Sequence, residues 1–196
     1  MRFDLGSEQT LGFMSRAPLH SRDFVDFAHR GDAEQRLARR RLVKSMVGLL
    51  AGVHPGDVII GRTALGAPLV SVPTGWHVSV SGHGSSCLIG AARQPIGVDA
   101  ERPDEPPPAD DHFTLRELAT LRSVPTGAIS ETRLHLWIAK EAHAKRTRRA
   151  RLIEASDIEV ARRSEGLFAR SAGAASRIWI HRTSGMLCAV ALGTRN

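Results

Sequence analysis

Apolar residues recur every three or four positions in two long segments of the chain, which predicts two long helices. The segments cover residues 32–50 and 130–145, and Asp32 and Ser130 are suitable N-cap residues. A shorter helix is predicted for residues 112–122. The apolar faces of the long helices consist of Leu42, Val43, Met46, Val47 and Leu50 in the first, and Leu134, Trp137, Ile138 and Ala142 in the second.

Alternating apolar and polar residues predict short antiparallel strands after each long helix. Residues 1–21 have weak periodicity and predict strand or loop, and the Pro-rich, acidic residues 102–111 predict an extended connector. The predicted strands are 58–60, 76–81, 87–92 and 96–101 in the first part, and 158–161, 167–170, 177–181 and 186–192 in the second.

One pattern occurs twice along the chain. A predicted strand that contains Trp76 precedes one that contains Cys87, and the same order returns with the strands that contain Trp179 and Cys188. We therefore predict an α+β fold of two pseudo-symmetric lobes, each a small, mainly antiparallel sheet packed on a long helix, with the active site between the lobes. The predicted lobes are residues 1–97 and 98–196. Chance alternation in any antiparallel sheet is the alternative explanation.

Composition restricts the class of protein. The 196 residues are 42% hydrophobic, which suits one large domain or two small ones. No apolar run approaches the roughly 20 residues that span a bilayer, and the N-terminus has no signal pattern. We expect a cytoplasmic protein without a membrane partner. Cys87 and Cys188 lie in apolar strands, which predicts buried, reduced thiols.

The charge of the chain points to an anionic partner. Lys and Arg outnumber Asp and Glu by 27 to 20, a net charge of +7. Arg36 and Arg40 stand one helical turn apart and can clamp a phosphate together, although a solvated basic face is the alternative. Nucleic acid, a phosphorylated small molecule and an acidic protein all fit this charge. Aromatic residues are only 5%, so a stacking platform for single strands is poorly supported.

Three carboxylates form a candidate metal site. Asp99 and Glu101 are two residues apart on a strand, so they share one face. Glu141 and Lys145 extend the buried face of the second long helix. An exposed acidic strand end and a surface ion pair are the alternatives for these two pairs. Together, the three carboxylates have the oxygen donors that Mg²⁺ prefers.

Two motifs resemble those of the 4′-phosphopantetheinyl transferases, in particular the two-lobed, surfactin-type members. The segment Ile96-Gly97-Val98-Asp99-Ala100-Glu101 resembles Gly-(Ile/Val)-Asp-x-Glu, and residues 137–145 resemble Trp-x-x-Lys-Glu-(Ala/Ser)-x-x-Lys. Residues 66–68 and 79–84 are similar to the family segments Gly-Lys-Pro and Ile-Ser-His-Ser-Gly. The similarity extends from about Asp32 to the C-terminus.

The resemblance implies transfer of the phosphopantetheine arm of coenzyme A to a serine of a carrier protein in fatty acid, polyketide or peptide synthesis. The other product is adenosine 3′,5′-bisphosphate. It implies Asp99, Glu101 and Glu141 as Mg²⁺ ligands, Glu141 also as the base, and Lys145 as the residue that neutralises the leaving phosphate. The residues expected to bind coenzyme A are Arg30, Arg36, Arg40, Ser81, His83 and Lys140.

The chain departs from the family pattern in three places. The motif His falls at Gly82, with His83 one place later; the Lys of Gly-Lys-Pro is Ala67; and Thr147-Arg148-Arg149 replaces a Gly-rich turn. We expect an acidic acyl or peptidyl carrier as partner and a monomer. The alternative functions are a Mg²⁺-dependent phosphoesterase and a basic nucleic-acid-binding module. No nucleic-acid-binding motif supports the second, so we expect no nucleic-acid partner.

Overall fold

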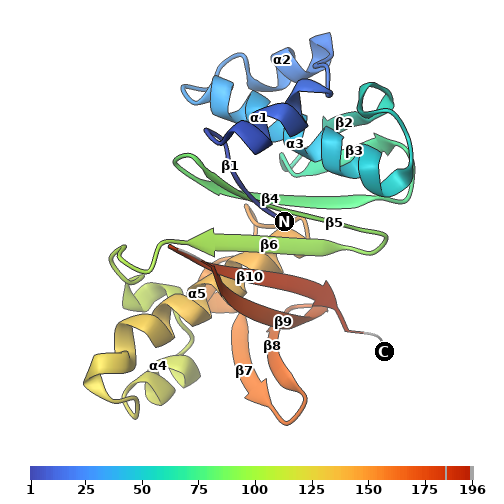
Figure 1. Cartoon of the computed structure of the whole chain (residues 1–196). Helices are drawn as coiled ribbons and strands as arrows, with labels where there is room; N and C mark the ends of the chain where they lie inside the picture. Colours follow the sequence, from blue (N-terminus) through green and yellow to red (C-terminus); the bar gives the residue numbers. More distant parts are fainter. Residues whose placement is uncertain (184, 195–196) are drawn as a thin grey trace. The chain divides into compact units, whose positions relative to one another are not determined.

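Two long helices organise two parts of the chain, each with its own antiparallel sheet. The computed structural model describes residues 1–183 and 185–194, and internal contacts divide the chain into Met1–Gln94 (unit 1) and Pro95–Asn196 (unit 2). The predicted α+β class of two sheet-on-helix lobes is confirmed (Figure 1). None of the helices formed by the described residues has both the length and the apolar character that crossing a bilayer requires.

Unit 1 packs helix α3 (Ala33–Ala51) against a three-stranded sheet of order β1-β5-β4. Leu42 and Val47 of α3 are fully buried in one core with Ile89 of β5, as their spacing predicts. The strands β2 and β3 form a separate antiparallel pair. The remaining elements of unit 1 are β1 (Arg2–Asp4), α1 (Glu8–Ser15), α2 (Ser21–Phe27), β2 (Ile59–Arg62), β3 (Pro68–Val72), β4 (His77–His83) and β5 (Ser86–Ala92).

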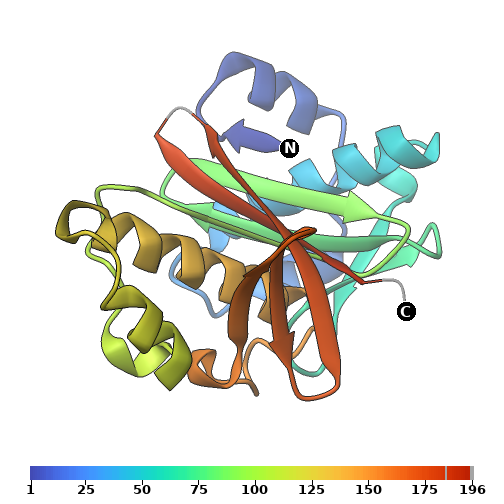
Figure 2. The same ribbon diagram turned by 90° about the horizontal axis from the view of Figure 1, so that it is seen from below.

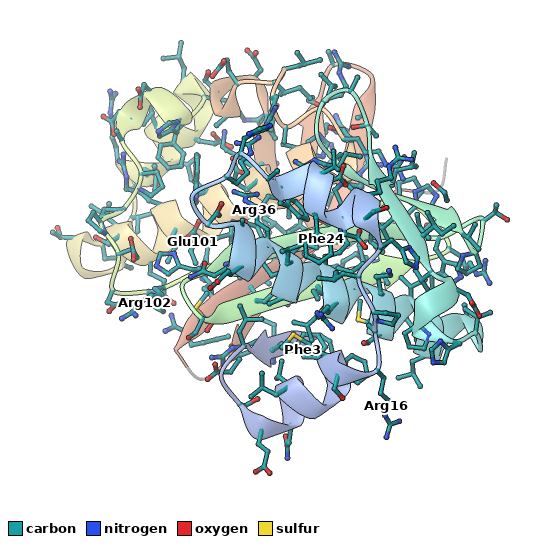
Figure 3. The ribbon with its side chains drawn as sticks, turned by 90° about the horizontal axis from the view of Figure 1, so that it is seen from above. Phe3, Arg16, Phe24, Arg36, Glu101 and Arg102 are labelled. Carbon is teal, nitrogen blue, oxygen red and sulfur yellow. The ribbon has the colours of Figure 1, made fainter. Side chains whose placement is uncertain are left out.

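The prediction of strand or loop for residues 1–21 was wrong for helix α1. This helix buries only Thr10 and Met14, so its apolar periodicity is too weak to indicate a helix. The side chain of Ser7 caps it by accepting a hydrogen bond from the backbone N of Thr10. Strand β1, which carries Phe3, lies beside it (Figure 3). The ring of Phe3 stacks on that of Phe13 with centroids 5.7 Å apart.

Unit 2 packs helix α5 (Ile129–Arg146) on a five-stranded antiparallel sheet of order β6-β10-β9-β8-β7 (Figure 2). Its core joins Ile138 and Ala142 of α5 to Leu187 and Ala189 of β10, all nearly or fully buried. The other elements of unit 2 are β6 (Ile96–Glu101), α4 (Leu115–Leu121), β7 (Glu159–Arg163), β8 (Gly166–Ser171), β9 (Ala174–Thr183) and β10 (Met186–Gly193).

The two units repeat one internal plan. In each, a short helix precedes the long helix, an antiparallel strand pair follows it, and a second hairpin follows that pair (β4-β5 and β9-β10). The last strand of each hairpin also pairs with the strand that opens its unit, because β5 pairs with β1 and β10 pairs with β6. In these two pairings, Cys87 faces Phe3 and Cys188 faces Ala100. The double pattern in the sequence therefore corresponds to a repeated topology.

Each long helix also carries a fully buried lysine that is paired with a carboxylate of the preceding short helix. The Nζ of Lys44 lies 3.4 Å from Asp23, and the Nζ of Lys140 lies 2.6 Å from Glu117. Both carboxylates also accept a backbone hydrogen bond at the start of their own short helix. Removing one partner of such a buried pair costs about 3–5 kcal/mol, so each pair fixes a short helix to a long one.

Candidate active site

A glycine on β6 determines how closely helix α5 approaches this strand. A Cβ atom at Gly97 would lie only 1.8 Å from the carbonyl oxygen of Ala142 on α5, so no other residue allows this contact. Side chains two residues apart share a face of a strand, so Asp99 and Glu101 lie on the same side as Gly97 and face α5. The Gly-x-Asp-x-Glu spacing therefore brings two carboxylates against one helix.

Helix α5 brings two charged groups to meet these carboxylates. Glu141 and Lys145 are one helical turn apart, and the Nζ of Lys145 donates to Oδ1 of the buried Asp99 at 2.5 Å. Burial by itself lowers the pKa of Lys145, but the ion pair with Asp99 and the negative charge of Glu141 raise this pKa above its usual value. Lys145 is therefore held in its charged form.

The carboxylates of this site influence one another electrostatically. Burial is the main reason that the pKa of Glu141 is raised, and Lys145 opposes the shift. The negative charges of Asp99 and Glu101 raise the pKa of Glu141 further. Like charges raise one another's pKa only when they lie close together, so the three predicted carboxylates belong to one cluster. We call Asp99, Glu101, Glu141 and Lys145 the acidic cluster.

The donor types of the acidic cluster suit a divalent cation. Three carboxylates face one ammonium group, so Lys145 neutralises only part of their negative charge. A Mg²⁺ ion would balance the remaining negative charge, and carboxylate oxygens are the hard ligands that Mg²⁺ prefers. Within residues 1–183 and 185–194, however, no three His, Cys, Asp or Glu side chains meet closely enough to ligate one ion. The assignment of Asp99, Glu101 and Glu141 as metal ligands stays a prediction.

Lys140 does not join the acidic cluster. Its side chain is fully buried, and its Nζ donates to the carbonyl oxygens of Ala155 and Ile158 at 2.8 and 2.5 Å and pairs with Glu117. An ammonium group has three N–H donors, and all three are used. We therefore correct the expectation that Lys140 binds coenzyme A: its position makes it a structural residue.

The sequence did not draw attention to His112, which lies near the acidic cluster. Its ring stands at a tilt to that of Trp137, with centroids 4.9 Å apart. Trp137 precedes Glu141 by one turn of α5, and the positive charge of His112 acts to lower the pKa of Glu141. Only the folded chain reveals that His112 lies near Glu141, because these two residues are 29 positions apart and no motif joins them.

Unit 1 contains a cavity of about 200 Å³ with an arginine-rich wall, which we call the arginine cavity. Burial lowers the pKa of Arg62, with Asp26 opposing the shift. The charges of Arg40, Arg36 and Arg30 lower this pKa further, so these guanidinium groups lie near one another. The lining residues are Phe27, Arg36, Arg39, Arg40, Val43, Ile60, Arg62, Gly66, Pro68, Val80 and Gly82.

Two of the predicted phosphate-binding arginines line this cavity but already have partners. Arg36 donates from Nε to Asp32 at 2.6 Å, and Arg40 donates to Asp26 at 2.9 Å and to the carbonyl oxygen of Ile60. Arg40 is buried, whereas about a third of the Arg36 side chain is exposed, 34%. Arg36 is therefore the better placed of the two to contact a ligand (Figure 3).

The other residues expected to bind coenzyme A lie outside the cavity lining. Val80 and Gly82 of β4 line the cavity, so Ser81 and His83 project from the opposite face of the strand. Arg30 is exposed and lies within electrostatic range of Arg62. Sequence reasoning missed Arg62, the last residue of β2, because its local sequence gives no signal of the cavity that it helps to form.

Comparison with known families identifies the class of protein that has this fold and this acidic cluster. The family model described as the 4′-phosphopantetheinyl transferase superfamily matches residues 95–191, and through this region the chain belongs to that superfamily. The chain is 25% identical over 121 residues to a 4′-phosphopantetheinyl transferase of Bacillus subtilis. The alignment covers 61% of this chain and 54% of the relative, so the chain spans about half the length of the curated relative that it matches.

Proposed function

We propose that the protein transfers the 4′-phosphopantetheine arm of coenzyme A to a serine hydroxyl of an acyl or peptidyl carrier protein. The acidic cluster, in the region that matches the superfamily, carries this proposal. The serine oxygen bonds to the phosphorus of the arm as the bond to adenosine 3′,5′-bisphosphate breaks. The reaction needs a group that accepts the serine proton and positive charge beside the leaving phosphate.

Glu141 is the proposed base. Its raised pKa means that its carboxylate accepts a proton more readily than that of an ordinary glutamate. Lys145 is the proposed donor to the leaving phosphate, because the cluster raises its pKa and keeps it charged. Asp99 accepts a hydrogen bond from Lys145 and thereby orients the ammonium group. All three roles belong to side chains that lie together in unit 2.

Asp99, Glu101 and Glu141 are the proposed ligands of Mg²⁺. When bound, the ion would neutralise charge on the pyrophosphate oxygens of coenzyme A. The Asp99→Ala variant removes one carboxylate, so we expect transfer to need a clearly higher Mg²⁺ concentration. A titration of transfer rate against Mg²⁺ checks this, and an unchanged half-saturation point would reject Asp99 as a ligand.

The arginine cavity of unit 1 is the proposed site for a phosphate at the nucleotide end of coenzyme A. Guanidinium groups bind phosphate through paired, charge-assisted hydrogen bonds. Arg36 and Arg62 line the cavity, and the mutual repulsion of its cations is relieved when an anion binds. Arg40 contributes charge but uses its N–H groups on Asp26 and Ile60.

The carrier protein is proposed to be acidic, which matches the net charge of +7. The segment that follows β6 contains three apolar residues that are candidates for an apolar dock, Phe113, Leu115 and Leu118. Phe113 is buried under the guanidinium of Arg133, with the cation 4.8 Å from the ring centroid, so it packs inside unit 2. Leu115 is 88% exposed and Leu118 is half-buried, so Leu115 is the residue of this group that a partner can reach most easily.

The experiment that tests the proposal incubates the protein with coenzyme A, Mg²⁺ and a panel of apo carrier proteins. Intact mass spectrometry should show the added arm on at least one carrier. Glu141→Gln should abolish transfer, with Glu131→Gln on the same helix as the matched control, since Glu131 pairs with the exposed Arg182. Near-normal transfer by Glu141→Gln would reject the base, and release of phosphopantetheine without a carrier would favour the phosphoesterase.

A further inference from the structure

Gly82 and Arg39 occupy one space in the arginine cavity. A Cβ atom at Gly82 would lie 2.3 Å from Cζ and 2.5 Å from Nε of Arg39, so any side chain at position 82 must displace this guanidinium group. Arg39 also donates from Nη2 to the carbonyl oxygen of Gly84 at 3.2 Å. The guanidinium group of Arg39, on α3, thus fills the space that a side chain at position 82 of β4 would occupy.

Arg39 differs from its neighbours in what its N–H groups contact. Arg36 donates from Nε to Asp32, and Arg40 is held by Asp26 and the carbonyl of Ile60. The Nε of Arg39 is buried and has no hydrogen-bond acceptor among the described residues. A buried donor without an acceptor costs about 1–3 kcal/mol, which a ligand that supplies an acceptor recovers.

The shape and charge of the site select the class of ligand. The cavity encloses about 200 Å³, which admits a phosphate group and the atoms next to it. Four arginines line it, and the ion pairs that these arginines form among the described residues join Asp23 and Asp26 to Arg40 and Asp32 to Arg36 rather than to Arg39. A guanidinium group in a fixed orientation matches two oxygens of one phosphate.

We propose that Arg39, lying on Gly82, is the principal phosphate-binding residue of the arginine cavity, in place of His83. The ligand is a phosphate monoester, which Arg39 contacts through Nε and Nη. This inference rests on the proposed function for its choice of ligand, the 3′-phosphate monoester of coenzyme A. His83 projects from the other face of β4, so it does not take this role.

The test measures binding of adenosine 3′,5′-bisphosphate by calorimetry, without carrier protein and without transfer. Arg39→Gln should weaken binding at least about ten-fold, as expected for the loss of a charge-assisted pair. Arg41→Gln is the matched control, because Arg41 also lies on α3 but donates to the carbonyl oxygen of Ala17. Equal affinities of the Arg39 and Arg41 variants, or a larger loss with His83→Gln, would overturn the inference.

Gly82→Ala tests the shared space independently. The added methyl group should displace Arg39 and weaken binding, and the double variant Gly82→Ala with Arg39→Gln should bind no more weakly than Arg39→Gln alone. Additive losses would contradict the shared position. Inorganic phosphate and adenosine serve as separate probes. Arg39→Gln should weaken the binding of inorganic phosphate and leave the binding of adenosine unchanged. A substitution that weakens only the binding of adenosine would reject phosphate binding by Arg39.

The two proposals can fail separately. If the protein binds the bisphosphate through Arg39 but modifies no carrier protein, the transferase assignment fails and the phosphate site stands. If transfer proceeds and Arg39→Gln binds the bisphosphate as tightly as the unmodified protein, the assignment of Arg39 fails and the transferase stands. Circular dichroism of each variant confirms that the fold is retained.

Discussion

His143 makes the stability of unit 2 depend on pH. This residue is fully buried on α5, and its Nδ1 and Nε2 lie 2.7 Å from the hydroxyl of Ser176 and 2.9 Å from that of Ser171. Arg146 donates to the same Ser176 hydroxyl at 2.6 Å. Burial, with a smaller effect from the Arg146 charge, lowers the pKa of His143 to about 4.

The magnitude follows from the difference between the folded and unfolded pKa. An unfolded histidine titrates near 6.5, so between about pH 6.5 and 4 the unfolded chain binds more protons at this position than the folded chain. The free energy of unfolding therefore falls as the pH falls through this window, and His143 has no such effect well above pH 7. At pH 4.5 the loss is about 2.5 kcal/mol.

The assay is urea denaturation at a series of pH values from 7.5 to 4.5, on the unmodified protein and on His143→Gln. The variant cannot be protonated at this position, so its unfolding free energy should fall less over the series, by about 2.5 kcal/mol. His29→Gln, which changes an exposed histidine, is the control for general effects. Parallel curves for the unmodified protein and His143→Gln would refute the reasoning.

Three further predictions concern stability. Gly97→Ala should destabilise unit 2 by more than about 3 kcal/mol, because its methyl group meets the α5 backbone, whereas Gly127→Ala, in open space, should cost little; thermal melts compare them. Arg148→Gly should raise the unfolding free energy by about 1 kcal/mol, since Arg148 has a φ of 59°, which favours glycine; an unchanged urea midpoint would contradict this. Lys140→Met should cost about 3–5 kcal/mol by leaving Glu117 buried and unpaired, and a melting temperature equal to that of the unmodified protein would reject the structural role.

Periodicity allowed most of the fold to be predicted from the sequence. The long helices and the hairpins β4-β5, β7-β8 and β9-β10 appear where apolar spacing placed them, because each buries a continuous face, whereas strand β3 was not predicted. Helix α1 escaped prediction because only Thr10 and Met14 of it are buried. The spacing of Asp99 and Glu101 predicted their common face, and the helical spacing of Glu141 and Lys145 predicted theirs. That the two pairs belong to one site was expected from the resemblance of their motifs and not from local geometry.

Contacts between distant segments account for what the sequence did not reveal. Lys140 and Glu141 are adjacent, yet successive helical residues point about 100° apart, and only the packed α5 determines which of them faces β6. The buried partner of Lys140 lies 23 residues earlier, on α4. Arg39 was not predicted to bind a ligand, because nothing in its local sequence indicates that a glycine 43 positions away leaves room for it.

The repeated topology has a consequence for stoichiometry. If Lys44 is matched with Lys140, Ser45 takes the place of Glu141 and Leu49 that of Lys145. If Cys87 is matched with Cys188, the strand partners align Arg2 with Asp99 and Asp4 with Glu101. The N-terminal copy of the framework thus keeps one of the three carboxylates and has an arginine where the other copy has an aspartate. Equilibrium dialysis should accordingly find a single magnesium ion per polypeptide, and a second equivalent would mean that the two halves are chemically more alike than their side chains suggest.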